Sequence, residues 1–175
     1  LGGGNSGRNT AILRANYRTL EAIPFYVESL RLYEGLSQEV DFNVLFSQQG
    51  HLTLAHTDTG VDGLRVRAEA NALLDVDSRL IFPEEIKSLV PAMDVSEDMH
   101  APIQAALYHP PGGIIRHDAV VWGYARGVDR MSIEIHPHTE VQAIETENGQ
   151  VTAVQTDRGR IKTGTVVNAT SGWCS

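Results

Sequence analysis

Apolar residues between Pro24 and Leu36 recur about every three positions, and charged residues separate them. This spacing places the apolar side chains on one face of a helix, in whose first turn a proline is tolerated. Residues 62–74, rich in Ala, Leu, Arg and Glu, predict a second helix. A third helix is predicted over Pro83–Leu89, where a proline and two acids favour a helix start.

Two short apolar runs, residues 44–46 and 51–55, are joined by a connection that contains Gly50. A glycine between two such runs is typical of a tight turn, so the simplest interpretation is a β-hairpin. Residues 91–104 contain two prolines and three acids with little periodicity. This composition predicts a surface loop.

A strand is predicted at residues 105–108, and the sequence Pro110–Gly113 predicts a sharp turn after it. Residues 118–131 carry Val, Tyr and Ala side chains on one side at helical spacing, which predicts another helix. His117 lies at the junction between this turn and this helix.

The C-terminal third alternates polar and apolar residues in four short runs, at residues 134–135, 140–144, 151–155 and 165–169. Asn148-Gly149, between the second and third runs, is a strong hairpin signal. A helix, a β-meander and an apolar strand that leads into a turn of small residues are typical of the middle of a dinucleotide-binding α/β domain.

The composition indicates a folded protein, because 42% of the 175 residues are hydrophobic and 21% are charged. We expect one domain or parts of two. The net charge of −8 argues against nucleic acid as a partner, since phosphate-backbone binding needs clustered Lys and Arg. No apolar run approaches the roughly 18 residues that cross a bilayer, and the first residues do not resemble a signal peptide.

Cysteine usage bears on the compartment. The single cysteine, Cys174, excludes an internal disulfide and agrees with a reducing, cytoplasmic setting. We therefore expect a soluble cytoplasmic protein without a membrane partner. Seven histidines are present, but His136 and His138 flank a proline and the others are scattered, so no metal site is expected.

The segment Gly2–Thr10 contains four glycines, short polar side chains and Arg8. A loop of this kind can bring backbone N–H groups close to an anion, and an arginine adds a charged donor. Taken alone, the same composition also fits a flexible linker.

Three blocks of sequence resemble the beta subunits of heterotetrameric sarcosine oxidases, which belong to the D-amino-acid-oxidase-like flavoproteins. The blocks are Gly4–Asn9 leading into Ile12–Arg14, then Gly112–Val120, and finally Val167–Trp173. Two further segments at similar spacing, residues 46–50 and 122–126, extend the resemblance through essentially the whole chain.

The resemblance implies an α/β (α+β) fold: a partial FAD-binding Rossmann-like domain of the D-amino-acid-oxidase/glutathione-reductase type, with part of an inserted substrate domain. Residues 1–42 are expected to belong to the FAD-binding domain and residues 43–110 to the substrate or interface domain. Residues 111–175 are expected to continue the FAD-binding domain, with the FMN attachment segment and the β-meander. The chain opens on Leu1 without a methionine, and we expect it to be an internal piece of a longer protein.

The resemblance also implies residues that bind non-covalent FAD. The N-terminal loop is expected to lie against FAD through Asn5, Ser6, Gly7, Arg8, Asn9 and Thr10, with Ile12 near the flavin ring. Arg14 is expected to face the carboxylate of the substrate, since its fork matches two oxygens; a surface arginine is the equally weighted alternative. The small-residue turn with Ala169, Thr170 and Gly172, and the strand residue Val141, are expected to contact the FAD as well.

His117 is implied to carry a second flavin, an FMN joined through an imidazole nitrogen to the 8α carbon of its ring. Arg116 beside it is expected to help hold the phosphate or the polarised flavin. Without the resemblance, a histidine before a helix is more often a cap or a surface residue.

The implied reaction is the oxidative demethylation of sarcosine to glycine. Electrons pass from FAD through FMN to oxygen and give hydrogen peroxide, while the imine hydrolyses or passes its one-carbon unit to tetrahydrofolate. Alpha, gamma and delta subunits are the implied partners. Two alternatives stay open: a single-flavin amine or glycine oxidase, or a dimethylglycine dehydrogenase-like enzyme, that uses FAD alone; and an inactive folded fragment or interaction module.

Overall fold

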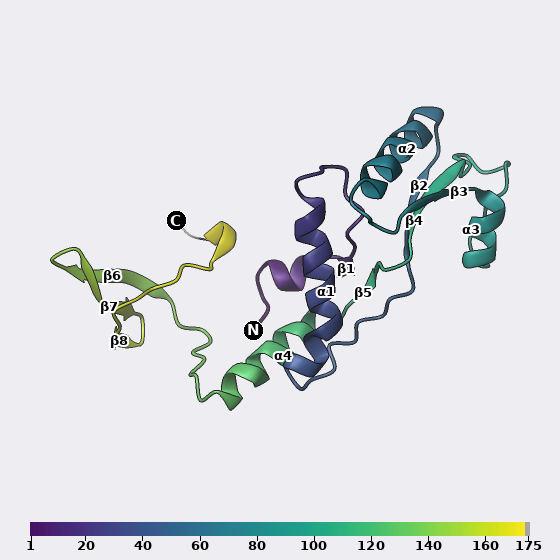
Figure 1. Ribbon diagram of the computed structural model, residues 1–175. Coiled ribbons are helices and arrows are strands. Elements are labelled where there is room, and N and C mark those ends of the chain that lie inside the picture. The colour runs from purple at the N-terminus through teal and green to yellow at the C-terminus, as the bar shows by residue number, and fades with distance from the viewer. Residues whose placement is uncertain (174–175) are drawn as a thin grey trace. The chain divides into compact units, whose positions relative to one another are not determined.

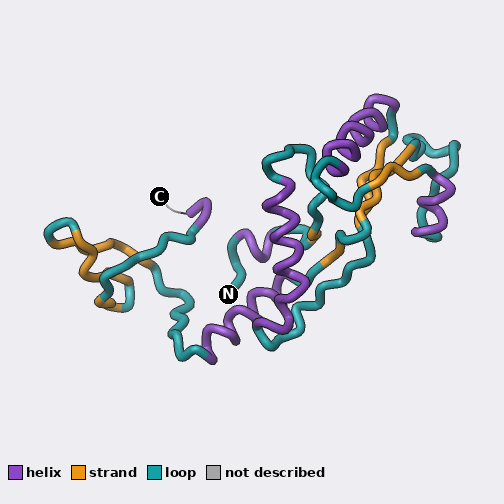
Figure 2. The backbone as a smooth tube through the Cα atoms, in the orientation of Figure 1, coloured by secondary structure: helices purple, strands orange, loops and turns teal. Residues whose placement is uncertain are grey.

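The computed structural model describes residues 1–173 and divides into two compact units, Leu1–Ile133 and a second unit that begins at Glu134 (Figure 1). Helices, short strands and long connections alternate along the chain (Figure 2). Among the described residues, no helix combines the length and the apolar character that crossing a membrane requires.

The first unit contains an antiparallel sheet in the order β2-β4-β3, formed by β2 (His51–Ala55), β4 (Ala105–His109) and β3 (Arg79–Ile81). The central strand β4 is buried on both faces. Leu107 packs with Leu64 of helix α2 (Asp58–Ala72), and Ala106 packs with Ile86 of helix α3 (Pro83–Leu89). Burial on both faces explains why β4 reads as a continuous apolar run rather than an alternating one.

Helix α1 (Ile23–Glu39) connects two further apolar clusters. Ile23 and Leu30 pack with Ala15 and Val76, whereas Leu36 packs with a second group of buried residues, Val40, Val44 and Ile115. The helix predicted at residues 24–36 is thus confirmed. Ile23 and Leu30, seven positions apart, lie on one face of the helix, whereas Leu36 is turned by roughly 120° from Leu30 and enters the second cluster.

Helix α4 (His117–Arg130) is held against the end of α1 at its middle and at its C-terminal end. A Cβ at Gly123 would lie 3.0 Å from Val40 Cγ2, so the missing side chain lets the helix backbone approach the α1 end closely. Arg130 donates 2.9 Å hydrogen bonds to the Asp41 carboxylate and to the Val40 carbonyl. The helix that presents His117 is therefore anchored to the end of α1.

The hairpin predicted from residues 44–46 and 51–55 is wrong. Residues 44–46 form no strand, since Leu45 has a φ of +56° while Val44 is buried in the second α1 cluster. The partner of β2 is β4, a strand more than fifty residues later in the sequence, along its whole length. Long-range pairing with a buried strand overrode the local turn signal.

A two-stranded antiparallel pair joins distant parts of the first unit. β1 (Ile12–Leu13) pairs with β5 (Gly113–Ile114), with Ile12 opposite Ile114. Ser47 exchanges backbone hydrogen bonds of 2.8 and 3.0 Å with Ile114 on the other side. The turn at residues 110–113 is confirmed, and residues 91–104 contain no helix or strand, as predicted (Figure 2).

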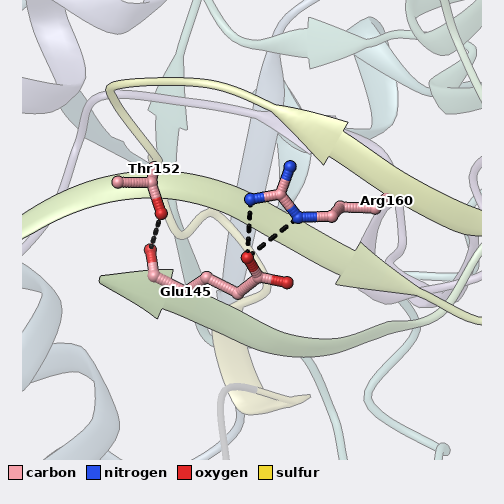
Figure 3. Close-up of polar contacts among 3 residues, drawn as sticks. All are labelled: Glu145, Thr152 and Arg160. Atoms are coloured by element: carbon pink, nitrogen blue, oxygen red, sulfur yellow. Dashed lines mark hydrogen bonds and ion pairs between the residues drawn. The ribbon is translucent and has the colours of Figure 1, made fainter. Parts of the chain in front are cut away.

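The second unit is a three-stranded meander of β6 (Val141–Glu147), β7 (Gln150–Thr156) and β8 (Gly159–Lys162). Its first turn confirms the Asn148-Gly149 prediction, since both residues have positive φ, +51° and +77°, as a two-residue hairpin turn requires. Glu145 on β6 and Arg160 on β8 form a 2.7 Å ion pair across the middle strand (Figure 3). The pair ties the two outer strands together.

Two predictions for this unit differ from the structure. Residues 165–169 and 134–135, predicted as strands, pair with no strand among the described residues. A strand needs a neighbouring backbone for its hydrogen bonds, so apolar composition alone does not create one. Strand β8 was not predicted, because its sequence Gly-Arg-Ile-Lys has a single apolar residue.

Gly113 offers a direct test of the close packing between β5 and the segment at Ser47 in the first unit. A Cβ there would collide with the Ser47 carbonyl oxygen and lie 2.9 Å from Gln48 Cα. We expect Gly113→Ala to lower the free energy of unfolding by about 1–3 kcal/mol, the usual range for overpacking. The control is Gly127→Ala in α4, where an added Cβ meets nothing within 4 Å; it should raise that free energy by about 1 kcal/mol. The measurement is the urea unfolding midpoint of each variant and of the wild type. Equal shifts for the two variants contradict the packing argument.

Candidate functional site

The glycine-rich loop folds into a short 3-10 helix, η1 (Asn5–Arg8), whose shape is closed by Asn9. The Asn9 side-chain amide donates to the carbonyls of Asn5 (3.1 Å) and Ser6 (2.6 Å), and its oxygen accepts from the Ala11 N–H (2.7 Å). A Cβ at Gly7 would collide with the Gly2 carbonyl oxygen. Local hydrogen bonds and the absence of a side chain therefore define this loop, rather than flexibility.

Strand pairing brings this loop beside His117. The Ile115 N–H donates to the Ala11 carbonyl (2.9 Å) directly beyond the β1–β5 pair, and η1 contacts α4. A pocket of about 290 Å³ lies between the loop and the start of α4. Its polar lining comes from Ser6, Asn9, Thr10 and His117, and its apolar lining from Ala11, Ile12, Leu13, Tyr33, Ile115, Val120 and Val121. Two blocks separated by about a hundred residues of sequence thus share one pocket.

His117 is the first residue of α4 and is half-buried. Its side chain forms no hydrogen bond with any residue that the structure describes. Arg116 does not line the pocket; its guanidinium makes a two-pronged ion pair with Asp118 at 2.9 and 3.1 Å, which lowers the pKa of that carboxyl. An imidazole facing a pocket without a partner is available for a bond to a ligand.

Arg14 lies outside this pocket, immediately after β1. Its guanidinium carbon sits 4.6 Å from the ring centroid of Tyr17, which in turn stacks on Tyr26 at 3.8 Å. No acidic side chain among the described residues forms an ion pair with Arg14. The arginine is therefore held by an aromatic face and not by an acidic side chain of the described residues.

Arg14 belongs to a polar cluster that the sequence did not predict, with His51, Arg67 and His109. Burial lowers the pKa of His51 to about 4, and the positive charges of Arg14 and Arg67 reinforce that effect. Burial also lowers the pKa of His109 and, together with Arg14, that of Arg67. At neutral pH the cluster holds two cations beside two neutral imidazoles.

The remaining predicted site residues lie in the second unit. Val141 is exposed at the start of β6, and Ala169, Thr170 and Gly172 are exposed near η2 (Ser171–Trp173). The backbone N–H and the hydroxyl of Thr170 both donate to the Asn168 side-chain oxygen, at 3.0 and 2.7 Å. Their roles toward FAD stay predictions. Cys174 lies outside the described residues.

The whole chain matches one protein family. Residues 1–175 fit the family model described as DAO, FAD dependent oxidoreductase. The chain belongs to this family. FAD is accordingly the cofactor of the family, and the described residues contain no group of three or more His, Cys, Asp or Glu arranged to hold a metal.

Curated relatives agree with the resemblance drawn from the sequence. Sarcosine oxidase subunit beta from Rhodobacter capsulatus is 42% identical over 175 residues, which are 100% of this chain and 42% of the relative. The subunit of the same name from Arthrobacter sp is 40% identical over 175 residues, or 100% of this chain and 43% of the relative. The chain thus spans about two fifths of the length of these relatives.

A solved structure supports the fold. L-proline dehydrogenase from P. horikoshii superimposes with a TM-score of 0.84 at 30% identity, and the match covers 96% of this chain and 43% of that one. This likeness and the family match confirm the predicted α/β fold of the D-amino-acid-oxidase type. The domain boundaries after residues 42 and 110 stay predictions.

The depressed pKa of His51 predicts acid sensitivity. The folded value of about 4 lies below the ordinary 6.5, so the unfolded chain binds the proton first as the pH falls. The stability that His51 contributes is complete above about pH 6.5 and is lost as the pH falls toward 4. We expect the urea midpoint to decrease between pH 7 and 5, and His51→Gln to reduce that slope. The exposed His100 is the control: His100→Gln should keep the wild-type slope, and equal slopes for all three proteins contradict the assignment.

Proposed function

We propose that this chain is part of a flavin-dependent amine oxidase of the sarcosine oxidase beta-subunit type. The observation that carries the proposal is the pocket in which the loop Asn5–Thr10 and His117 meet. The identity of 40–42% to sarcosine oxidase subunits beta supports the choice of amine. The net reaction converts sarcosine, dioxygen and water into glycine, formaldehyde and hydrogen peroxide.

The residues of the N-terminal loop fit FAD. Ser6, Asn9 and Thr10 place short polar groups along one side of the pocket, and Ile12 adds an apolar contact for a ring. Gly7 leaves the loop backbone without a side chain at its tightest point, as close approach to a cofactor needs. Bound FAD supplies the electron-accepting chemistry, while the chain's own residues bind and orient the reactants. Arg8 and Asn5 belong to the same proposed contact.

His117 fits the attachment of a second flavin. Its half-buried imidazole has no hydrogen-bond partner among the described residues, and a neutral imidazole offers a nitrogen lone pair for a bond to carbon. We assign it the covalent attachment of FMN, in which a bond from the imidazole nitrogen to the 8α carbon would replace a C–H bond and the two electrons released would pass to dioxygen, giving hydrogen peroxide. Arg116, although paired with Asp118 on the surface, carries the nearest positive charge in sequence for the FMN phosphate.

The proposal also includes partner subunits, the fate of the one-carbon unit and a location. A covalent FMN held by His117 would supply a route for electrons from FAD to oxygen, and alpha, gamma and delta subunits complete the proposed heterotetramer. The one-carbon unit goes to water or to tetrahydrofolate. A cytoplasmic location is part of the proposal. The relatives of this chain carry the name of a subunit, which supports an assembly of several chains.

Flavin attachment is the first test. The intact reading frame that contains this sequence is expressed with its neighbouring genes, denatured and digested. We expect the peptide with His117 to retain the mass of FMN, and His117→Ala to abolish it while non-covalent FAD remains. The exposed His138 gives the control, since His138→Ala should leave the adduct intact. An unmodified His117 with FAD alone favours the single-flavin amine or glycine oxidase or the dimethylglycine dehydrogenase-like enzyme; absence of both flavins favours a non-catalytic folded module.

Arg14 is proposed to bind the carboxylate of the substrate, since its guanidinium has no acidic partner in the described chain. We expect Arg14→Met to raise the KM for sarcosine about 10- to 100-fold, because a hydrogen bond to a charged group contributes about 1.5–3 kcal/mol. Steady-state kinetics at saturating oxygen provide the measurement. Arg18→Met removes an exposed arginine four residues away and serves as the control. An unchanged KM in Arg14→Met rejects this role.

A further inference from the structure

The three residues that follow Arg14 are held in place by side chains from distant elements. The Ala15 N–H donates to His109 Nε2 at 3.2 Å, from the end of strand β4. Arg67 of helix α2 donates through Nε to the Asn16 carbonyl and through a terminal nitrogen to the Asn16 side-chain oxygen at 3.0 Å. One turn later on α2, Asn71 donates to the Tyr17 carbonyl at 2.9 Å.

These side-chain contacts provide the backbone hydrogen-bond partners that a neighbouring strand would otherwise provide. The residues from Arg14 to Tyr17 lie in no helix or strand, and Ala15 and Asn16 are buried. Buried backbone N–H and C=O groups need partners, and here side chains provide them. His109 and Asn71 are themselves almost fully buried, at 1% and 0% exposure. Holding a short irregular segment by three buried or half-buried side chains fixes its conformation closely.

The His109 ring can act in only one tautomer. Its Nδ1 lies 2.6 Å from the Asp77 carbonyl oxygen, which accepts but cannot donate a hydrogen bond. The proton therefore sits on Nδ1, and Nε2 is the bare nitrogen that accepts from the Ala15 N–H. The neutral ring links the segment before β3 to the segment after Arg14, and a ring protonated on both nitrogens could not make this link.

The position of Arg67 beside Arg14 also indicates a binding site for an anion. Its guanidinium lies close enough to Arg14 for the two positive charges to affect each other, and no acidic side chain in the described chain forms an ion pair with either of them. Like charges placed together without a counter-ion cost free energy. The cost is offset when an anion binds, and the arrangement thus suits a site that takes a carboxylate.

We propose that His109, Arg67 and Asn71 form a polar clamp on Ala15–Tyr17 that positions the Arg14 guanidinium for the carboxylate of an amino-acid substrate. The three are positioning residues, since their hydrogen bonds go to the residues that follow Arg14. This inference rests on the proposed role of Arg14 as the carboxylate ligand of an amine oxidase. It adds that side chains on α2 and β4 determine how strongly Arg14 binds the carboxylate. Both elements lie apart from β1 in the sequence.

The experiment uses the intact flavoenzyme and two probes. One is sarcosine turnover; the other is acetate, a carboxylate without an amine, whose Kd is read from the absorbance change of the bound flavin. We expect Arg67→Gln and His109→Leu to weaken acetate binding and to raise the KM for sarcosine roughly ten- to hundredfold, the effect of a misplacement of about 1 Å. The kcat should change much less than the KM.

Conservative variants and a control separate positioning from general instability. Arg67→Lys keeps the charge but loses the two-pronged contact, so it should bind acetate with intermediate affinity. His109→Gln keeps an acceptor near the Ala15 N–H and should recover part of the loss if His109→Leu folds poorly. Arg65→Gln, an exposed position on the same helix, should match the wild type. Flavin content and melting temperature identify any variant that fails to fold.

A double-mutant cycle provides the decisive result. In an Arg14→Met background, Arg67→Gln should have little further effect on acetate binding, because the residue that it positions is already gone. Equal effects of Arg67→Gln in both backgrounds overturn the clamp, as does wild-type acetate binding in both Arg67→Gln and His109→Leu. Acetate binding that depends on Arg14, combined with no sarcosine turnover by the wild type, rejects the proposed substrate but leaves the clamp standing.

Discussion

The segment from Ala11 to Tyr17 contains the buried residues Ala15 and Asn16, and it has to satisfy their backbone polar groups although only Ile12 and Leu13 lie in a strand. Its partners therefore come from distant parts of the sequence. At one end the Ala11 carbonyl accepts from Ile115, and at the other the Ala15 N–H donates to His109. Buried polar groups without partners cost free energy, so this requirement places the end of β4 and the residue after β5 next to the segment.

Both candidate binding features follow from this segment. Pairing at its N-terminal end sets His117 beside the glycine-rich loop, and the side-chain contacts at its C-terminal end gather Arg67 and His109 around Arg14. The pocket proposed for a cofactor and a cationic cluster therefore lie at the two ends of one short stretch of backbone. In an oxidase that takes electrons from an amino acid, the cofactor and the carboxylate ligand have to be held at a fixed separation, which a rigid connection provides.

The sequence predicted the elements whose signals are local. The helices at residues 23–39 and 83–89 followed from apolar spacing and start signals, and the Asn148-Gly149 turn followed from its need for positive φ. The hairpin at residues 44–55 was wrong because the choice of strand partner depends on residues 105–109, far along the chain. Strand pairing is decided by packing partners that a local pattern does not contain.

The candidate site, too, has a part that the sequence predicted and a part that it did not. The loop and His117 were found through a resemblance between blocks, and the structure brings them to one pocket. The clamp was missed, since its hydrogen bonds join residues separated by 94, 51 and 54 positions. Arg67 and Asn71 stand four residues apart on one helix, and that spacing was the only signal available.

Some buried polar atoms of the described residues have no hydrogen-bond partner, which lowers the stability of the folded state. Five buried side-chain atoms lack hydrogen-bond partners, and three of them, Asn16 Nδ2, His51 Nδ1 and Asn71 Oδ1, belong to the clamp or to the cluster beside it. Each such atom is unfavourable in a folded protein, as is the proximity of two guanidinium groups. Local conflicts of this kind concentrate at functional sites, where a ligand satisfies what the protein alone does not. A carboxylate accepts from an amide N–H and from guanidinium groups, so it would satisfy Asn16 Nδ2 and offset the repulsion between Arg14 and Arg67, whereas Asn71 Oδ1 is itself an acceptor.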